Sequence, residues 1–245
     1  MCGRYTLTAP GDVLAELFGL DEWPEVEARY NVAPTQEVAA VRVDEAGGGR
    51  RFVRLKWGLV PAWADDPAIG NRMINARAES AAEKPAFRTS FKRKRCLVLA
   101  DGFYEWQKIE GGKKQPWYFR LESGEPFAFA GLWSSWNKGG GDPARGPIES
   151  CTILTTDANP LVGKIHPRMP VILDPAAYEL WLDSSVEDRE RLEAALEPFD
   201  PAKMIAYPVS TRVNSPANDE PSVIEPQGEA ERAGPEPVEE QRELF

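Results

Sequence analysis

Long apolar runs are missing from this sequence of 245 residues. A helix that spans a bilayer needs about 20 consecutive apolar residues, and no run approaches that length. The first residues, Met1-Cys2-Gly3-Arg4-Tyr5, also lack the apolar core of a secretory signal. We therefore expect a cytoplasmic protein that has no membrane partner.

Cysteine and histidine are scarce. The three cysteines, Cys2, Cys96 and Cys151, are odd in number and widely spaced, and His166 is the single histidine. This pattern argues against a disulfide framework and a zinc site, and we expect reduced thiols and no metal or cofactor. Cys96 and Cys151 lie in apolar runs, where a cysteine is usually a small buried hydrophobe.

An excess of positive charge is also absent, since the net charge is −10. Such a charge argues against a nucleic-acid partner. However, residues 228–245 hold six acids and two bases, so this stretch carries −4 and the rest of the chain −6. Basic clusters occur at Arg50–Arg51–Arg54–Lys56 and at Lys92–Arg93–Lys94–Arg95. A local basic groove that binds DNA is therefore compatible with the composition.

Short runs rich in β-branched and aromatic residues predict strands, and glycine clusters separate them. The predicted strands are Val38–Val43, Phe52–Trp57, Arg95–Ala100, Trp117–Leu121, Phe127–Leu132 and Thr152–Thr155. The glycine clusters at 47–49, 111–112 and 139–141 predict turns or loops. The last of them lacks the spacing of a phosphate-binding loop.

Helical periodicity appears in three separate stretches, Gly11–Leu20, Pro175–Leu182 and Val186–Leu196. Asp174 precedes the second as an N-cap, with proline at the first helical position. Scattered strands with a few separate helices predict an α+β fold in one β-rich domain, residues 1–227. Residues 228–245 are acidic, contain two prolines and have no apolar period, which predicts a disordered tail.

Cys2 is the residue with the most distinctive chemistry. A small residue at position 2 favours removal of the initiator methionine, which would leave an N-terminal cysteine. Its α-amine has an ordinary pKa of about 8 and its thiol one of about 8.5. The amine can condense with an aldehyde to an imine, and the thiol can then close a five-membered thiazolidine ring. The alternative is an incidental cysteine in a first strand.

Two further positions are candidates for proton transfer. Glu105 follows an apolar strand among aromatic residues, where a desolvated carboxyl group would have a raised pKa. The alternative for Glu105 is the solvent face of an alternating strand. His166 lies between Lys164 and Arg168 in a proline-flanked segment, which suggests a constrained loop facing an anion. A lone histidine is more often a surface residue or a satisfied core residue.

Taken together, several segments resemble the SOS-response-associated peptidase (SRAP) family. They are Met1–Tyr5, Arg29–Thr35, Trp57–Trp63, Ile74–Glu79, Asp101–Trp106 and Ile165–Leu173, and they occur in this order over most of residues 1–227. A late segment, Val213–Asn214 followed by Val223–Pro226, looks like the closing strand of the family. One departure is the pair Pro167 and Met169, which limits the freedom of the His166 loop.

The resemblance implies strands curled into a barrel-like core beside a basic groove that binds single-stranded DNA with abasic sites. It further implies self-removal of Met1 and a thiazolidine crosslink between Cys2 and the abasic sugar. Asn75, Glu105 and His166 would be the other catalytic residues: Asn75 orients the adduct, Glu105 moves protons during ring closure, and His166 acts at the sugar oxygen. DNA contacts would come from Arg4, Asn31, Thr35, Trp63, Arg77 and Arg168.

Two rival functions are compatible with the same residues. A cysteine peptidase or hydrolase could use Cys2 with His166, and blocking the α-amine would spare it while abolishing crosslinking. A simple nucleic-acid-binding module would tolerate Cys2→Ala. The sequence leaves open whether strand-cleaving lyase activity accompanies capture, and we expect a monomer.

The C-terminal residues suggest a partner. Gln241, Leu244 and Phe245 resemble the short peptides that dock into DNA sliding clamps, with two apolar side chains for a pocket and a glutamine for its rim. The alternative is a solvated tail whose last two residues are apolar by chance. The first interpretation predicts a nucleoid-associated protein recruited to replication sites.

Overall fold

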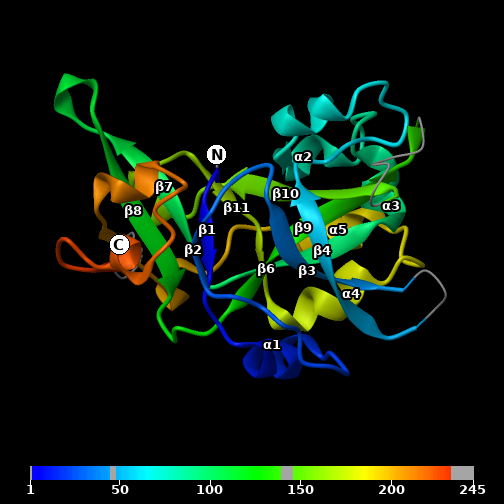
Figure 1. Cartoon of the computed structure of the whole chain (residues 1–245), viewed down its shortest axis with the longest axis horizontal. Helices are drawn as coiled ribbons and strands as arrows, with labels where there is room; N and C mark the ends of the chain where they lie inside the picture. Colours follow the sequence, from blue (N-terminus) through cyan, green and yellow to red (C-terminus); the bar gives the residue numbers. More distant parts are fainter. Residues whose placement is uncertain (1, 45–47, 139–145, 233–245) are drawn as a thin grey trace, which may run out of the picture.

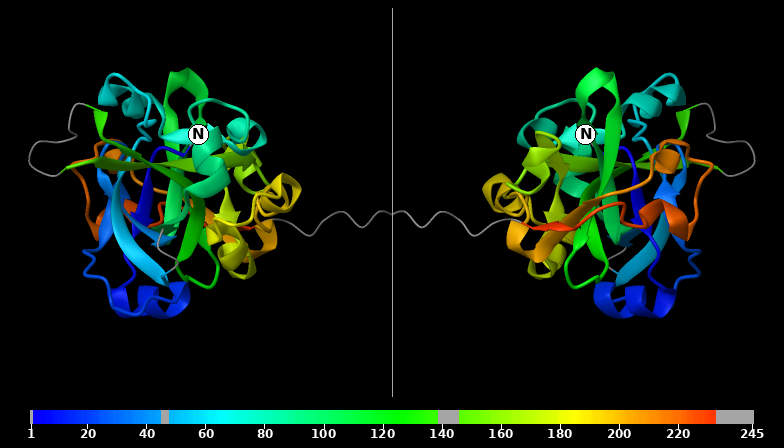
Figure 2. Two further views of the ribbon diagram at one scale, coloured as in Figure 1. Left: turned by 90° about the vertical axis from the view of Figure 1, so that its right-hand side faces the viewer. Right: turned by 90° about the vertical axis from the view of Figure 1, so that its left-hand side faces the viewer.

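A computed structural model describes residues 2–44, 48–138 and 146–232. Two β-sheets lie side by side, with short helices around their outer faces (Figure 1; Figure 2). No helix of these described ranges is long and apolar enough to cross a membrane.

One sheet closes on itself into a five-stranded barrel. Each barrel strand pairs with two others, and β10 returns to β4, which closes the ring. Closure leaves these strands no open edge. The barrel strands are β3 (Glu37–Val43), β4 (Arg50–Trp57), β6 (Arg95–Ala100), β9 (Phe127–Trp136) and β10 (Ile148–Asp157). Three short strands extend the barrel: β5 (Asn75–Arg77), β11 (Arg168–Pro170) and β12 (Ile172–Leu173).

The second sheet has six strands in the order β14-β13-β8-β7-β1-β2. Their bounds are β1 (Tyr5–Leu7), β2 (Arg29–Val32), β7 (Gly102–Lys108), β8 (Lys114–Leu121), β13 (Met204–Pro208) and β14 (Glu231–Arg232). Only Asp101 separates β6 of the barrel from β7 of this sheet. Tyr5 packs edge-on against Trp57 and Phe129 of the barrel, with ring centroids 5.4 and 5.7 Å away. These contacts fix β1 against the barrel wall.

The helices are short. They are α1 (Gly11–Phe18), α2 (Ala78–Ala81), α3 (Arg88–Arg93), α4 (Tyr178–Leu182) and α5 (Arg189–Ala194). The segment holding α2 and α3 covers the upper right of Figure 1, whereas α1 lies at the bottom.

Most of the elements expected from the sequence are confirmed. All six predicted strands occur, with β4, β8, β9 and β10 longer than predicted by two or more residues. The predicted α+β, barrel-like fold is also confirmed. Asp174 caps a 3-10 turn that leads into α4, as its pattern predicts. The third helix is shorter than its periodic stretch, since Asp188 caps α5 at Arg189. Cys96 and Cys151 are buried free thiols.

The predicted closing strand is wrong. Residues 211–226 contain two 3-10 turns, Thr211–Asn214 and Pro221–Ile224, in place of a strand. Pro216 and Pro221 disfavour a ladder, and the carbonyls of Val213 and Asn214 accept hydrogen bonds from the Arg4 side chain. The side chains of Arg4, just before β1, and of Asn31 in β2 therefore hold residues 213–218, and Pro226 adds a single bridge to Val209.

The start of the predicted tail also differs from expectation. Glu231–Arg232 forms β14 on the edge of β13, and Arg232 pairs with Glu122. The backbone of these two residues of the acidic segment thus pairs with β13, which the amino-acid composition does not predict. Gly47, the glycines at 139–141 and the tail from residue 233 lie outside the described residues.

Candidate functional site

Cys2 is held where the two sheets meet. On one side, the Tyr104 N–H of β7 donates to the Arg4 carbonyl at 3.0 Å. On the other side, the Asn75 side-chain amide of β5 donates to the Cys2 carbonyl at 2.7 Å. Residues 2–4 are thus tied to both the open sheet and the barrel, which leaves Cys2 little freedom to move.

The Cys2 thiol is fully buried and uncharged at neutral pH. Burial is the largest cause that raises its pKa, and the negative charge of Glu105 raises it further. The Cys2 sulfur also lies 3.6 Å from the Arg4 carbonyl, within donating distance. A nucleophilic hydrolase needs the opposite shift, a thiolate stabilised by nearby positive charge. Since Met1 still precedes it in this chain, the nitrogen of Cys2 is an amide.

Glu105 and Asn75 supply polar groups from two different strands. Glu105 is only 3% exposed, and burial raises the pKa of its carboxyl group, while the charge of His166 acts in the opposite direction. The interpretation of Glu105 as a solvent-facing strand residue is therefore wrong. Asn75 Oδ1 is buried and accepts no hydrogen bond from the described residues. A buried acceptor without a donor marks a place for a further hydrogen-bond donor.

His166 follows the 3-10 turn Val162–Lys164, and its N–H donates to the Val162 carbonyl at 2.9 Å. Its Nδ1 lies 3.1 Å from the Arg168 N–H and 2.9 Å from the Arg168 carbonyl. The ring is only partly exposed, and its charge acts on Glu105. The structure thus brings together Cys2, Asn75, Glu105 and His166, the four residues expected to be catalytic.

The two candidate arginines beside this cluster differ in their surroundings. Arg77 is exposed at the end of β5, and its side chain forms no hydrogen bond or ion pair with any described residue. Arg168 of β11 is largely buried and pairs with Glu79 and Asp157. A phosphate could meet Arg77 directly, whereas Arg168 would first have to release a carboxylate.

Arg4 and Asn31, both expected to touch DNA, form an internal network. Arg4 Nη1 donates to Asn31 Oδ1 at 2.8 Å and to the Val213 carbonyl at 2.7 Å. Asn31 is fully buried, and its Nδ2 lies within 3.1 Å of the Val213, Ser215 and Asn218 carbonyls. In this arrangement Asn31 lies behind the surface and not along a groove wall.

Thr35 and Trp63 are exposed, as a groove-lining role requires. Thr35 has a φ of 72°, a left-handed conformation that is costly for a β-branched residue. Its N–H donates to the Trp57 carbonyl at 2.8 Å. Trp63 is 56% exposed, which is unusual for tryptophan and leaves a ring face for a base.

A glycine explains how the chain passes between these positions. Gly58 has a φ of +134°, and a Cβ there would lie 2.6 Å from the Gly70 carbonyl oxygen. Its N–H donates to the Cys151 carbonyl, and the N–H of Leu59 donates to the Met73 carbonyl. The close approach of Gly58 and Gly70 therefore joins the Trp63 loop to the segment that leads into β5.

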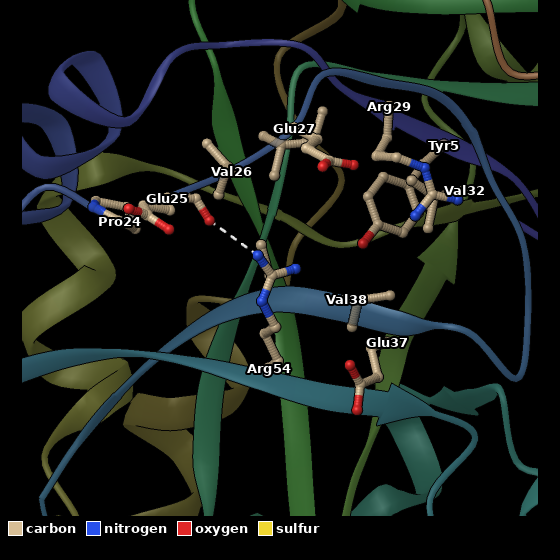
Figure 3. Close-up of a pocket in the computed structure, with 12 residues that line it drawn as sticks. Tyr5, Pro24, Glu25, Val26, Glu27, Arg29, Val32, Glu37, Val38 and Arg54 are labelled. Carbon is tan, nitrogen blue, oxygen red and sulfur yellow. Dashed lines mark hydrogen bonds between the residues drawn. The ribbon is translucent and has the colours of Figure 1, made fainter.

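A separate pocket of about 530 Å³ opens on the outside of β1–β4 (Figure 3). Tyr5 of β1, the strand that follows Cys2, lines it, but none of the four clustered residues does. Arg54 bonds to the Glu25 carbonyl at its rim. Three glutamates and two arginines line it, so its charges nearly cancel and it does not attract a phosphate backbone.

Glu79 and Asp157 are site residues that sequence reasoning missed. Glu79 ends the motif Ile74–Glu79, so its position was visible in the sequence, although its partner was not. Asp157 ends β10, which the sequence predicted to stop at Thr155. Neither ion pair with Arg168 could be read from the sequence. Glu79 is distant from Arg168 in the chain, and Asp157 meets Arg168 only because β11 turns back on β10.

Comparison with known proteins defines the class. The family model of the SOS response associated peptidase (SRAP) matches residues 1–216, and the chain belongs to this family. Abasic site processing protein YoqW of Bacillus subtilis is 45% identical over 228 residues, covering 92% of this chain and 99% of the relative. Abasic site processing protein YedK of Escherichia coli is 32% identical, covering 92% and 100%.

A solved structure shares the fold. A Bacteroides thetaiotaomicron protein superposes with a TM-score of 0.80 at 27% identity, covering 92% of this chain and 99% of that one. Among vertebrate relatives, abasic site processing protein HMCES of Gallus gallus is 38% identical over 213 residues. That match covers 76% of this chain and 60% of the relative.

Proposed function

We propose that this protein processes abasic sites in single-stranded DNA by capturing them covalently at Cys2. The observation that carries the proposal is the cluster around Cys2, where a buried thiol adjoins a desolvated carboxyl group and a buried acceptor, Asn75 Oδ1, that lacks a donor. The bacterial and vertebrate relatives are named abasic site processing proteins, which gives independent support.

The chemistry starts with removal of Met1. Addition of water to the Met1–Cys2 peptide bond releases methionine and turns the Cys2 amide into a primary amine. The amine adds to the aldehyde of the ring-opened abasic sugar, and loss of one water gives the imine. The thiol sulfur then bonds to the imine carbon and its proton passes to the nitrogen, which closes the thiazolidine ring. Relative to amine, thiol and aldehyde, one water is lost.

Each clustered side chain has a part in this sequence. A neutral Glu105 carboxyl group can protonate the departing hydroxyl when the imine forms, because its raised pKa favours the protonated form. Asn75 Oδ1 accepts a hydrogen bond from the new amine and so orients it. His166 exchanges a proton with the sugar oxygen. Asn75 already holds the Cys2 carbonyl and Tyr104 holds the nearby Arg4 carbonyl, so ring closure costs little further entropy.

DNA binding uses the sugar-phosphate backbone, because an abasic site has no base to read. Arg77 is the phosphate contact that the geometry favours, since its guanidinium group is exposed and unpaired among the described residues. Trp63 and Thr35 complete the DNA surface, with the Trp63 ring against a neighbouring base.

A cysteine hydrolase is the rival function. It would need a reactive thiolate, but both burial and Glu105 raise the pKa of Cys2. Aldehyde capture tolerates a neutral thiol, because the amine reacts first and the thiol closes a ring afterwards. Peptidase activity then describes the single self-processing event at Met1.

The test is a crosslinking assay with single-stranded DNA that carries one abasic site. We expect a heat-stable, slowly migrating species for the wild type and for the matched control Cys96→Ala, whose cysteine lies in the core. Cys2→Ser retains an amine but forms an oxazolidine much less readily, so only an imine trapped by reductant is expected. A stable crosslink at wild-type yield from Cys2→Ser would refute the mechanism.

We also propose that the C-terminal peptide binds a DNA sliding clamp and recruits the protein to replication sites. Gln241, Leu244 and Phe245 lie outside the described residues, so their pattern carries this proposal. Micromolar affinity is expected, because a flexible peptide must order on binding. Titration of a Gly228–Phe245 peptide against a clamp tests it, with Leu244→Ala and Phe245→Ala as the variant pair. Absence of binding at tens of micromolar contradicts it.

A further inference from the structure

The guanidinium group of Arg168 is fully engaged within the protein. Nη1 donates to Glu79 Oε1 and to Asp157 Oδ1, both at 2.6 Å. Nη2 donates to Glu79 Oε2 at 2.9 Å and to the Thr155 carbonyl at 2.6 Å. Arginine has five N–H donors, and the fifth, at Nε, is buried without a partner among the described residues. No donor is therefore left on the surface for a phosphate.

This arginine links three separate elements. Its backbone belongs to β11, while Thr155 and Asp157 belong to β10 and Glu79 to the first turn of α2. The pairing with Glu79 is bidentate, which fixes the orientation of the guanidinium plane. Hydrogen bonding to Arg168 holds the pKa of the Glu79 carboxyl group below its usual value. Glu79 is therefore ionised at neutral pH and keeps its partner.

The backbone of the same arginine holds the ring of His166. When Nδ1 carries a proton, it can donate to the Arg168 carbonyl at 2.9 Å, and when it carries none, it can accept from the Arg168 N–H at 3.1 Å. Both neutral tautomers and the cation thus find an Nδ1 partner on one residue. The ring can keep its place while Nε2, on its opposite edge, gains or loses a proton.

We infer that Glu79 is a positioning residue for His166 and acts through Arg168. The bidentate pair fixes the Arg168 side chain, and with it the peptide groups that hold Nδ1. This assignment rests on the proposed function for the role of the His166 ring, although the geometry of the ring can be measured without that reaction.

The first test is spectroscopic. His166 is the only histidine of the chain, so its ring nitrogens are the only imidazole signals in a ¹⁵N spectrum. In Glu79→Gln, one charged acceptor is lost, and we expect the ring ¹⁵N shifts to move toward those of a freely exchanging imidazole. The matched control is Glu83→Gln, which removes a nearby carboxylate that pairs with Arg189 instead. Unchanged ring shifts in folded Glu79→Gln would overturn the assignment.

The second test separates rate from binding. At saturating abasic DNA, Glu79→Gln should crosslink about 10-fold to 100-fold more slowly, the range typical of residues that orient a catalytic group. Its affinity for intact single-stranded DNA should stay within about twofold of Glu83→Gln. If Arg168 were instead a phosphate contact restrained by Glu79, the variant would bind DNA more tightly and with a steeper salt dependence. That outcome refutes the positioning role.

The two tests also distinguish this inference from the proposed function. If the wild type forms no crosslink but Glu79→Gln changes the His166 signals, the proposed function fails while the structural link stands. If Glu79→Gln does not fold, Asp157→Asn removes the second carboxylate, which is mostly exposed. It should give a smaller shift in the same direction, because the bidentate pair remains. No shift in Asp157→Asn together with wild-type crosslinking counts against the inference.

Discussion

Replacement of Asn31 by alanine tests whether the Arg4–Asn31 network serves folding or DNA. The substitution removes the hydrogen bond from Arg4 and leaves the carbonyls of Ser215 and Asn218 without their amide donor. A hydrogen bond to a charged group contributes about 1.5–3 kcal/mol and a neutral one about 1 kcal/mol. The Asn31 amide has two hydrogens, so two neutral bonds and one charged bond are lost.

The expected loss in the free energy of unfolding is therefore about 4 kcal/mol. For a chain of this size each kcal/mol lowers Tm by about 2–4 °C, which predicts a fall of about 8–16 °C. Asn31→Asp keeps the acceptor for Arg4 but loses the donors, so it should lose about half as much. Asn71→Ala, at an exposed asparagine of the 3-10 turn Pro67–Arg72, is the matched control and should leave Tm unchanged.

Calorimetric unfolding of the three variants measures the effect. Binding of intact single-stranded DNA is then compared at a temperature where all variants are folded. We expect Asn31→Ala to bind DNA about as well as Asn71→Ala. A normal Tm combined with lost DNA binding would show that Asn31 contacts DNA, as the family resemblance implies, and that the network described here is not its main role.

Three further predictions concern charge and strain. Because burial raises the pKa of Glu105 in the folded state above its usual value of 4.5, the stability contributed by its neutral carboxyl group is lost as pH rises through the raised pKa. Glu105→Gln should therefore become more stable relative to wild type as the pH rises, measured by unfolding at several pH values. It should also crosslink slowly at each pH. Equal pH dependence in both proteins contradicts a raised pKa. Arg77→Ala should weaken binding of single-stranded DNA and reduce the slope of log K against log salt by about 0.7, whereas an unchanged slope excludes a phosphate contact. Thr35→Asn should stabilise the fold by about 1 kcal/mol, because asparagine tolerates the left-handed conformation better, and a lower Tm would argue against strain at this turn.

Much of the candidate site could be anticipated from the sequence because its chemistry is local to short motifs. Cys2, Glu105 and His166 each have a distinctive sequence context, whereas Asn75 and the barrel that brings the four residues together were implied by the resemblance to the SRAP family. Their proximity depends on strand pairing, which the motifs alone do not specify.

The roles of the arginines could not be anticipated in the same way. Arg4 is bonded to carbonyls more than 200 residues away, and Arg168 is bonded to carboxylates from two other elements. A basic residue beside a catalytic motif looks like a phosphate contact until its partners are known. The wrong prediction of a strand near residues 213–214 has the same cause, since the side chains of Arg4 and Asn31 take the carbonyls of this segment.

The central claim is that one residue supplies both reacting groups, and peptide mass spectrometry of the crosslinked protein tests it most directly. After nuclease digestion, the account predicts an N-terminal peptide that starts at Cys2, lacks Met1, and carries the sugar remnant with the loss of one water. Its thiol should resist alkylation, whereas Cys96 and Cys151 react after unfolding. An adduct on a lysine, or on a peptide that retains Met1 or an alkylatable Cys2, would contradict the account.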